Sequence, residues 1–431
     1  MASKTALNAK NLEALGAARL AALLMEISTG NAGAKRRLRL ELASVQSPKD
    51  AAREIRKRLV TIARSRTFVD WQKRKALAAD LDMQRRAITS NFAPADPTEA
   101  LELLWRFMAL ADPIFSRCDD SSGTIIGIFR VALDDLAEIA TSAKPKPEAL
   151  AEQVFAAIQD NGFGQYDGVI ATLAPMLGER GLQHLKELVQ SLSEEWTAPP
   201  SPGEEEVVGW GSAGPVSAHE VAASARRSTV SMALKDIADA SGDVDGFVAQ
   251  YDQKARRVPA IAAQIANRLL DAGRNEDALA ALNAAETDGN RWIPREFHEA
   301  RFRALDATGR ASEAQAARWQ NFEHTLSVDD LRGYLKRLPD FDEIDAEEQA
   351  LDHAKHHPNL LLALTFLLDW KAFDCATDLV MTRWKELDGN RYEILTLAAD
   401  ALSKNSPLAA TRVLRAMIDF TLGSVDGLIE F

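Results

Sequence analysis

The sequence predicts an essentially all-α protein, and three observations support this fold class. Apolar residues recur at spacings of three and four along most of the chain, which is the period of a helix with one buried face. Runs of alternating β-branched residues are scarce, and alanine, which favours helix, is abundant throughout. Helices are expected around residues 9–28, 68–90, 98–111, 124–141, 147–159 and 179–193.

The second half of the chain contains an internal similarity. The stretch "LLDAGRNEDALAAL" from Leu269 resembles "ALDATGRASEAQAA" from Ala304, and each reads as a helix, a Gly-Arg turn and a second helix. The small residues Ala278 and Ala314 occupy the inner face of the second helix and lie 36 residues apart. This spacing is close to the period of tetratricopeptide-type helical hairpins.

Weaker copies of the same pattern extend the similarity in both directions. Their equivalent buried positions are expected to be Phe247, Ala376 and Ala409. Gly273 and Gly309 suit left-handed positions that end a helix and let the chain reverse. Because a two-helix unit cannot bury its apolar face alone, we expect residues 218–431 to stack as helical-hairpin repeats, a tetratricopeptide-like α-solenoid that lacks most consensus Trp and Tyr residues.

A Pro-, Gly- and Glu-rich stretch interrupts the helical pattern and predicts the main domain boundary. Its tryptophans, Trp196 and Trp210, favour a structured crossing loop that packs against the rest of the chain. The predicted organisation is a basic N-terminal helical segment (1–92), a helical region with two Asp/Gly-rich loops (93–195), the connecting loop (196–217) and the repeats (218–431).

Composition excludes several classes of protein. The chain has 431 residues, of which 46% are hydrophobic and 26% charged, as is normal for a soluble globular protein. No apolar run approaches the length of a membrane span and no secretion signal is evident, so a cytoplasmic location without membrane attachment is expected. The two cysteines, Cys118 and Cys375, are too far apart to predict a disulfide framework or a zinc site.

Charge is distributed unevenly along the chain. Residues 1–92 contain 19 Lys or Arg and 8 Asp or Glu, a net charge of +11, which leaves −23 for the rest of a chain whose total is −12. The stretch "REIRKRLVTIARSR" (53–66) places Ile55, Leu59 and Ile62 on one apolar stripe and most of its basic residues elsewhere. The candidate polyanion-binding residues are Arg53, Arg56, Lys57, Arg58, Arg64, Lys73, Arg74, Lys75, Arg85 and Arg86. Docking of these residues on the acidic remainder or on an acidic protein is the favoured explanation, and binding of nucleic acid is the alternative.

Two loops rich in Asp and Gly precede predicted helices and are candidate groove loops. In "RCDDSSG" (117–123), Asp119 and Asp120 suit the cap of a helix beginning near Thr124, and capping is favoured over anion binding or a reactive cysteine. The loop "DNGFGQYDG" (160–168) contributes Asp160, Tyr166 and Asp167. If the two loops met, their aspartates could bind Mg²⁺ or a cationic peptide, although ordinary inter-helix loops explain both sequences.

Longer motifs carry a resemblance to a known family. These are "CDDSSGTIIGIF" (118–129), "DNGFGQYDGVI" (160–170) and "RWQNFEHTLSVDDLRGYLKRLPDFDEIDAEEQALDHA" (318–354). With them the chain resembles an uncharacterised bacterial helical-repeat family, a domain of unknown function whose repeats are similar to the region after the zinc knuckle of SWIM zinc-finger proteins. The CxC and CxH ligands of that knuckle are absent, so the resemblance implies neither zinc nor functional residues. It also implies that similar proteins continue beyond "GSVDGLIEF", where this chain stops.

Known catalytic signatures are missing from the sequence. It contains no P-loop, no GxGxxG after a strand, no GxSxG and no kinase signature, so we expect no enzymatic activity, no cofactor and no metal. The leading hypothesis is a cytoplasmic, non-catalytic scaffold for a protein or peptide partner. The alternative is a nucleic-acid-binding protein that uses the basic N-terminal helices, and the oligomeric state is left open.

Overall fold

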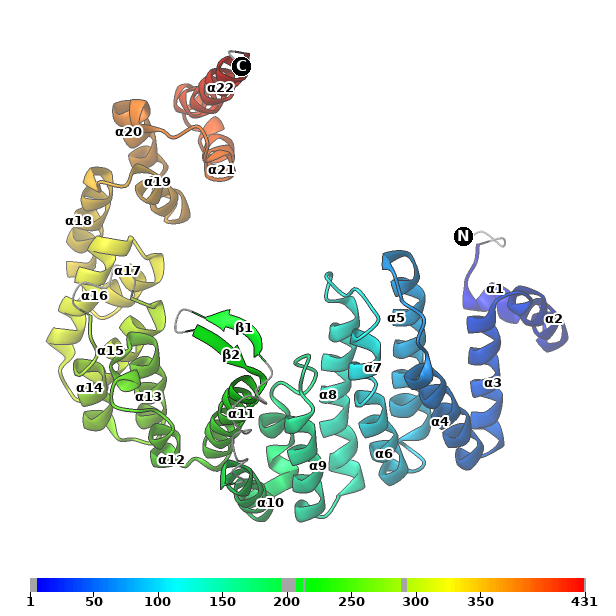
Figure 1. The fold of residues 1–431 in the computed structure, drawn as a ribbon. Coiled ribbons are helices and arrows are strands. Elements are labelled where there is room, and N and C mark those ends of the chain that lie inside the picture. Colours follow the sequence, from blue (N-terminus) through cyan, green and yellow to red (C-terminus); the bar gives the residue numbers. More distant parts are fainter. Residues whose placement is uncertain (1–5, 195–206, 212–213, 288–292, 430–431) are drawn as a thin grey trace. The chain divides into compact units, whose positions relative to one another are not determined.

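The computed structural model describes residues 6–194, 207–211, 214–287 and 293–429, and these are almost entirely helical (Figure 1). The predicted all-α class is confirmed. The chain forms two compact units, Met1–Gln250 and Tyr251–Phe431. This division falls after the connecting loop predicted at 196–217, because the helix that follows the loop packs on the helix that precedes it. None of the described helices has the length and apolar character that crossing a membrane requires.

The first unit is built from helices that pack mainly on their neighbours in the chain (Figure 1). They are α1 (Ala9–Glu13), α2 (Ala17–Ser28), α3 (Ala32–Gln46), α4 (Pro48–Arg64), α5 (Trp71–Arg86), the π-helical turn η1 (Ala87–Phe92), α6 (Pro97–Met108), α7 (Ala111–Phe115), α8 (Thr124–Ala143), α9 (Pro147–Gln159), α10 (Val169–Glu194), α11 (Ala218–Ser241) and α12 (Val244–Ala249).

Local sequence signals explain where several of these helices begin and break. The helix predicted over 9–28 is interrupted at Gly16, whose φ of 79° is incompatible with a right-handed helix. Asp70 accepts a hydrogen bond from the Lys73 N–H, so α5 begins at Trp71 and not at residue 68. Helix α10 contains Pro175 and bends at Gly178, and the helix predicted over 179–193 is its second half.

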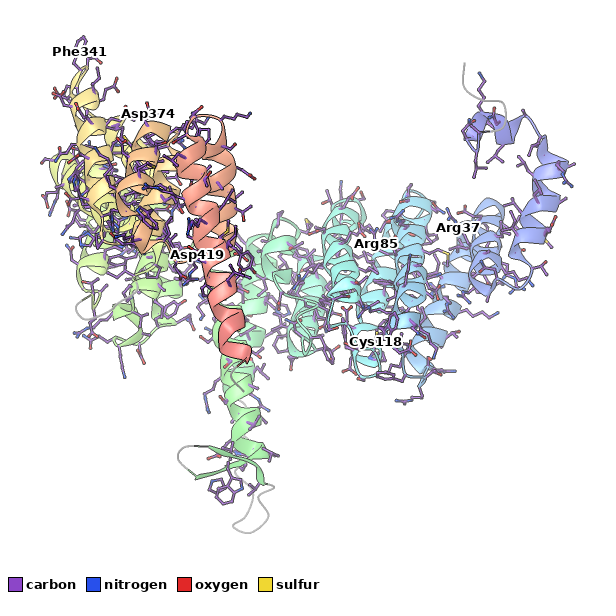
Figure 2. All side chains as sticks on the ribbon, turned by 90° about the horizontal axis from the view of Figure 1, so that it is seen from above. Arg37, Arg85, Cys118, Phe341, Asp374 and Asp419 are labelled. Carbon is purple, nitrogen blue, oxygen red and sulfur yellow. The ribbon has the colours of Figure 1, made fainter. Side chains whose placement is uncertain are left out.

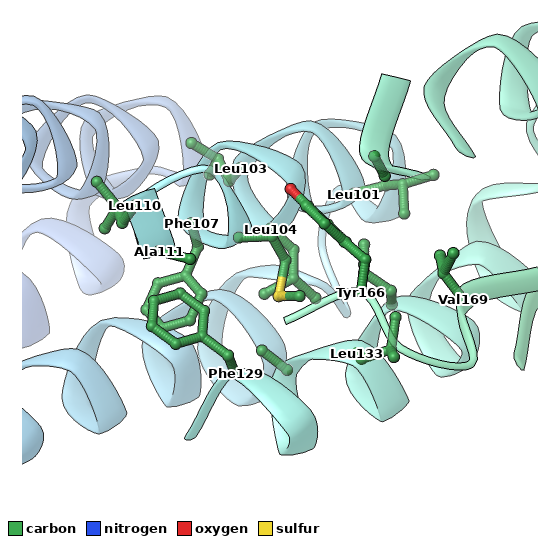
Figure 3. Packing of buried hydrophobic residues seen from close by; sticks show 14 of the residues in the cluster. Leu101, Leu103, Leu104, Phe107, Leu110, Ala111, Phe129, Leu133, Tyr166 and Val169 are labelled. Atoms are coloured by element: carbon green, nitrogen blue, oxygen red, sulfur yellow. The ribbon is translucent and has the colours of Figure 1, made fainter. Parts of the chain in front are cut away.

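The core of the first unit lies between α4, α6, α8, α9 and α10. The predicted stripe of α4 is confirmed, since Ile55, Leu59 and Ile62 are all buried. Figure 3 shows the centre of this core, where the rings of Phe107 and Phe129 lie 5.4 Å apart and both residues are inaccessible to solvent. Burial of such large apolar side chains is the main force holding these helices together.

A short β-hairpin forms the described end of the predicted connecting loop. Strands β1 (Val207–Gly211) and β2 (Gly214–Ser217) pair antiparallel. Ser217 then begins α11 with reciprocal hydrogen bonds between its side chain and backbone and those of Glu220. The prediction that the loop packs through its tryptophans is wrong for Trp210, which is 82% exposed, and Trp196 lies outside the described residues.

The second unit consists of helices and two short 3₁₀ turns. Its elements are η2 (Ala255–Arg257), α13 (Pro259–Asp271), α14 (Asn275–Asn283), α15 (Arg295–Ala307), α16 (Ala311–Thr325), α17 (Val328–Leu335), α18 (Asp342–His356), α19 (Leu360–Asp369), α20 (Phe373–Arg383), η3 (Trp384–Glu386), α21 (Tyr392–Ser403) and α22 (Pro407–Ile429). Helices adjacent in the chain pack in pairs, α13 on α14, α15 on α16, α19 on α20 and α21 on α22. The side chains at the end of α22, and Phe431, lie outside the described part of the chain.

Several helix-to-helix turns share one backbone geometry. The turn residues Gly242, Gly273, Gly309 and Lys371 have φ values of 70°, 74°, 75° and 65°. In each turn this residue donates its N–H to the carbonyl three residues earlier, and the next N–H bonds the carbonyl five residues before it. Five residues after each turn residue comes a buried side chain, namely Phe247, Ala278, Ala314 and Ala376. The predicted left-handed caps at Gly273 and Gly309 are therefore confirmed.

Candidate functional site

Many of the predicted polyanion-binding residues are engaged by acids within the first unit. Asp80, on α5, is 6% exposed, and its Oδ2 accepts a hydrogen bond of 3.0 Å from Nε of Arg58 on α4. Nη2 of Arg36 on α3 lies 3.5 Å from the same oxygen. A carboxylate buried this deeply requires cationic or hydrogen-bonding partners, and two arginines from neighbouring helices supply them. Arg58 is thus a structural residue that joins α4 to α5.

A second ion-pair network surrounds Arg85, whose position is labelled in Figure 2. Its guanidinium lies 2.6 Å from Asp135 on α8 and 2.9 Å from Asp82, and Asp82 also pairs with Arg86 at 2.9 Å. Burial acts to lower the pKa of Arg85, but the hydrogen bonds to the two carboxylates raise it overall. Burial raises the pKa of Asp135, and Arg85 opposes that shift. Arg85 therefore ties α5 to α8 and is largely withdrawn from solvent.

Other members of the predicted basic set also have partners. Arg53 pairs with Asp50 at 3.0 Å and remains 72% exposed, while Lys73 lies 3.3 Å from Asp70. The remaining partnered members are Arg56, which forms an ion pair with Glu99, and Arg74, whose guanidinium donates to the carbonyl of Asp119 at 3.0 Å. The basic side chains are thus partly neutralised by acids of their own unit.

Three exposed members of the set have side chains without a partner among the described residues. The side chains of Lys57, Arg64 and Lys75 are exposed and make no hydrogen bond or ion pair with any residue that the structure describes. Two aromatic side chains, Phe68 and Trp71, lie close to them in the chain and are 61% and 69% exposed. Exposed aromatic rings next to unpaired cations are typical of surfaces that contact single-stranded nucleic acid.

A hollow between α3, α4 and α5 was not predicted from the sequence. Its volume is about 160 Å³, and its lining residues are Arg36, Arg39, Leu40, Glu54, Lys57, Arg58, Thr61 and Gln84. The basic residues at positions 36 and 39 and at 57 and 58 could have been grouped only with knowledge of how α3 lies against α4. Helical spacing in the sequence relates only the lining positions within α4, which recur at three and four residues, and does not connect them to α3.

The loop at 117–123 caps α8. The Asp120 carboxylate accepts hydrogen bonds from the N–H groups of Ile125 and Ile126 at 2.9 Å, and Asp119 accepts one from Ser121 at 3.0 Å. The favoured capping interpretation is confirmed. Cys118 is buried at the start of this loop (Figure 2), and burial, followed by the charge of Asp120, raises the pKa of its thiol. A raised pKa opposes formation of the thiolate that a nucleophile requires.

The loop at 160–168 lies against α7, since the ring centroids of Phe163 and Phe115 are 5.0 Å apart. Asp167 accepts a hydrogen bond from the Asn161 side chain at 2.8 Å. Tyr166 is buried (Figure 3), with its ring 6.2 Å from that of Trp105, and burial followed by the charge of Asp160 raises its pKa. Tyr166 thus has a packing role.

The carboxylates of the two loops do not form the predicted acidic cluster. Burial, followed by the charge of Asp112 on α7, raises the pKa of Asp160. Asp120 is occupied by backbone N–H groups and Asp167 by Asn161. Among the described residues, no group of three His, Cys, Asp or Glu side chains could hold a metal ion. The hypothesis that Asp119, Asp120, Asp160 and Asp167 form a Mg²⁺ site is therefore wrong.

The protein is therefore α-helical, with buried ion pairs and with exposed basic residues that lack a partner. The part of the chain that the structure describes contains no group of residues arranged to bind a metal ion. The chain belongs to the family described as "Family of unknown function (DUF6880)", which matches residues 2–426. This agrees with the predicted membership of an uncharacterised family, whereas no similarity to SWIM zinc-finger proteins is found. The curated proteins contain no match to this chain.

Proposed function

We propose that the protein is a non-catalytic scaffold whose stacked helical hairpins present an extended surface to a protein partner. The observation that carries this proposal is the recurring turn at Gly273, Gly309 and Lys371, with the same backbone hydrogen bonds and a buried alanine five residues later. Recurrence of one helix–turn–helix geometry supports a tetratricopeptide-like repeat construction. Stacked repeats commonly form extended binding surfaces, and their function lies in the side chains that remain exposed.

The turn between α17 and α18 holds the best candidate for a partner contact. Phe341 is 81% exposed and lies at the outer tip of this turn, pointing away from the neighbouring helices (Figure 2). Its φ is 78°, a left-handed conformation that a bulky side chain rarely adopts. A strained, exposed aromatic residue contributes neither to packing nor to backbone stability. We therefore infer that Phe341 contacts another molecule.

The surroundings of Phe341 indicate the chemistry of the partner. Ile344, in the first turn of α18, is 62% exposed. The acidic neighbours are Asp340, Asp342, Glu343 and Asp345, and all are exposed. An apolar tip ringed by carboxylates complements an apolar pocket bordered by Lys or Arg. The surface formed by residues 340–345 is named the acidic tip.

The test compares two substitutions that relieve the same kind of backbone strain. Phe341→Gly removes the aromatic ring, whereas Lys371→Gly changes another exposed residue with positive φ, in a turn outside the acidic tip. The partner is identified by cross-linking and mass spectrometry of the full chain in cells that naturally express it, then purified for affinity measurement. We expect Phe341→Gly to stabilise the fold and to weaken binding, and Lys371→Gly to stabilise the fold and leave binding unchanged. Equal affinity of both variants and the wild type would exclude the acidic tip as the contact.

Nucleic-acid binding is the second candidate, and the exposed pair Phe68 and Trp71 beside open cations favours it. Its test is the affinity of the full chain for single-stranded RNA across a salt series. Neutralising Arg64 and Lys75 should flatten the salt dependence, and Trp71→Ala should weaken binding at every salt concentration. Lack of binding at low salt would eliminate this candidate.

A further inference from the structure

The hollow between α3, α4 and α5 combines a cationic rim with a buried polar floor. The residues from α3 and α4 follow helical spacing, so their side chains point into the space where the two helices meet. Four of the lining residues are basic and Glu54 is the acidic one, so the lining is cationic. Helices α3 and α4 pack directly on each other, which gives the rim a defined geometry.

The basic residues of the hollow differ in availability. The buried Asp80 holds Arg58 and Arg36, and their charge is largely compensated. The side chains of Arg39 and Lys57 are exposed and have no ion pair or hydrogen bond with any described residue. The hollow therefore offers two uncompensated cations, one from each helix, to an incoming anion.

The floor contains buried polar atoms without partners. Gln84, on α5, is 2% exposed, lines the hollow, and its Oε1 accepts no hydrogen bond from the described residues. Nε of Arg36, another lining residue, is likewise buried and unpaired among them. A buried polar atom without a hydrogen bond is destabilising, so such atoms in a cavity indicate a bound molecule that donates to Gln84 Oε1 and accepts from Arg36 Nε.

We propose that this hollow binds a small phosphorylated polyol, such as a sugar phosphate. Arg39 and Lys57 contact the phosphate at the rim, and a ligand hydroxyl group donates to Gln84 Oε1 on the floor. The volume of about 160 Å³ equals that of roughly five liquid waters at ~30 Å³ each, so the hollow takes one part of a small polyol while the phosphate stays at the rim. An anion without hydroxyl groups would leave Gln84 Oε1 unsatisfied, so the site should prefer a hydroxylated anion to inorganic phosphate.

The experiment is isothermal titration calorimetry of the full chain with glucose 6-phosphate, inorganic phosphate, glucose and an oligouridine, at constant ionic strength. We expect saturable binding of glucose 6-phosphate, weaker binding of phosphate and none of glucose. Lys57→Gln and Arg39→Gln should each weaken binding by about tenfold, because each removes a charge-assisted contact. Gln84→Leu should reduce the preference for glucose 6-phosphate over phosphate. Arg37→Gln is the matched control, since Arg37 is exposed on α3 and does not line the hollow (Figure 2).

Some outcomes would overturn the proposal. One is the absence of saturable heat with both phosphate ligands, which would mean that the hollow holds only water. Another is an equal loss of affinity in Arg37→Gln and Lys57→Gln, which would indicate general electrostatic attraction. Binding of oligouridine without glucose 6-phosphate binding would assign these cations to nucleic acid instead. Thermal unfolding of every variant is measured alongside, and Lys57→Gln and Arg39→Gln, which alter exposed side chains, should keep the wild-type melting temperature.

Discussion

Placing a Cβ atom at the left-handed turns of the second unit should lower its stability, and removing one should raise it. Gly273→Ala and Gly309→Ala force an L-residue into φ values of 74° and 75°, whereas Lys371→Gly relieves a φ of 65°. An added Cβ at either glycine has no atom within 4 Å, so no steric clash contributes and the backbone conformation alone decides the effect.

The magnitude follows from two opposing contributions. The left-handed conformation costs an L-residue about 1–2 kcal/mol, while replacing glycine reduces the entropy of the unfolded chain by about 0.4–1 kcal/mol in the opposite sense. Each Gly→Ala change should therefore destabilise the unit by about 1 kcal/mol. Lys371→Gly should stabilise it by a similar amount, because the Lys371 side chain is exposed and makes no hydrogen bond or ion pair with the described residues.

The assay is thermal unfolding of the full chain followed by circular dichroism, with hydrogen exchange to assign the effect to the helices beside each turn. For a unit of this size a change of 1 kcal/mol moves the melting temperature by roughly 2–4 °C. The control is Gly333→Ala, because Gly333 lies inside α17 with no positive φ, and alanine there should stabilise by about 0.5–1 kcal/mol. If Gly273→Ala and Gly309→Ala were neutral or stabilising like the control, the assignment of left-handed turns would be refuted.

Substitutions at three further residues test the ion pairs and caps of the first unit. Asp80→Asn should destabilise by about 3 kcal/mol, since it leaves Arg58 without a buried counter-charge; an unchanged urea midpoint would contradict the role of this pair. Asp120→Ala should cost about 1 kcal/mol in thermal unfolding, and Asp120→Asn much less, because asparagine can still cap α8; equal losses would argue against capping. The hydrogen bond from the Gly246 N–H, followed by Lys186, lowers the pKa of Asp243 below its ordinary value of 3.8. A lowered pKa contributes stability above that value, so the advantage of wild type over Asp243→Asn should be complete near neutral pH and disappear as the pH falls through the folded-state pKa; a constant difference in melting temperature would contradict this.

Elements with local start and stop signals were predicted well. Helix α8 begins at Thr124 because Asp120 caps it, and α9 begins at Pro147, which suits the first helical position. The hairpin formed by β1 and β2 was not predicted from the sequence. Its strands are short, and the Pro and Gly residues of the surrounding stretch predict a loop. The role of Asp120 was predictable, whereas its separation from Asp160 and Asp167 depended on how distant helices pack.

By itself the sequence determined the helical class, the buried stripe of α4 and the left-handed turns at Gly273 and Gly309. These features depend on side-chain period and on backbone conformational preferences, which act over a few residues. Only the tertiary structure decided which basic side chains are neutralised and which stay open. Asp80 pairs with Arg58 and Arg36, which lie 22 and 44 residues away in the chain, because α3, α4 and α5 pack together. The same packing places Gln84 in the hollow that these two arginines line. Buried charges must be compensated wherever packing places them, and no local pattern of residues encodes that placement.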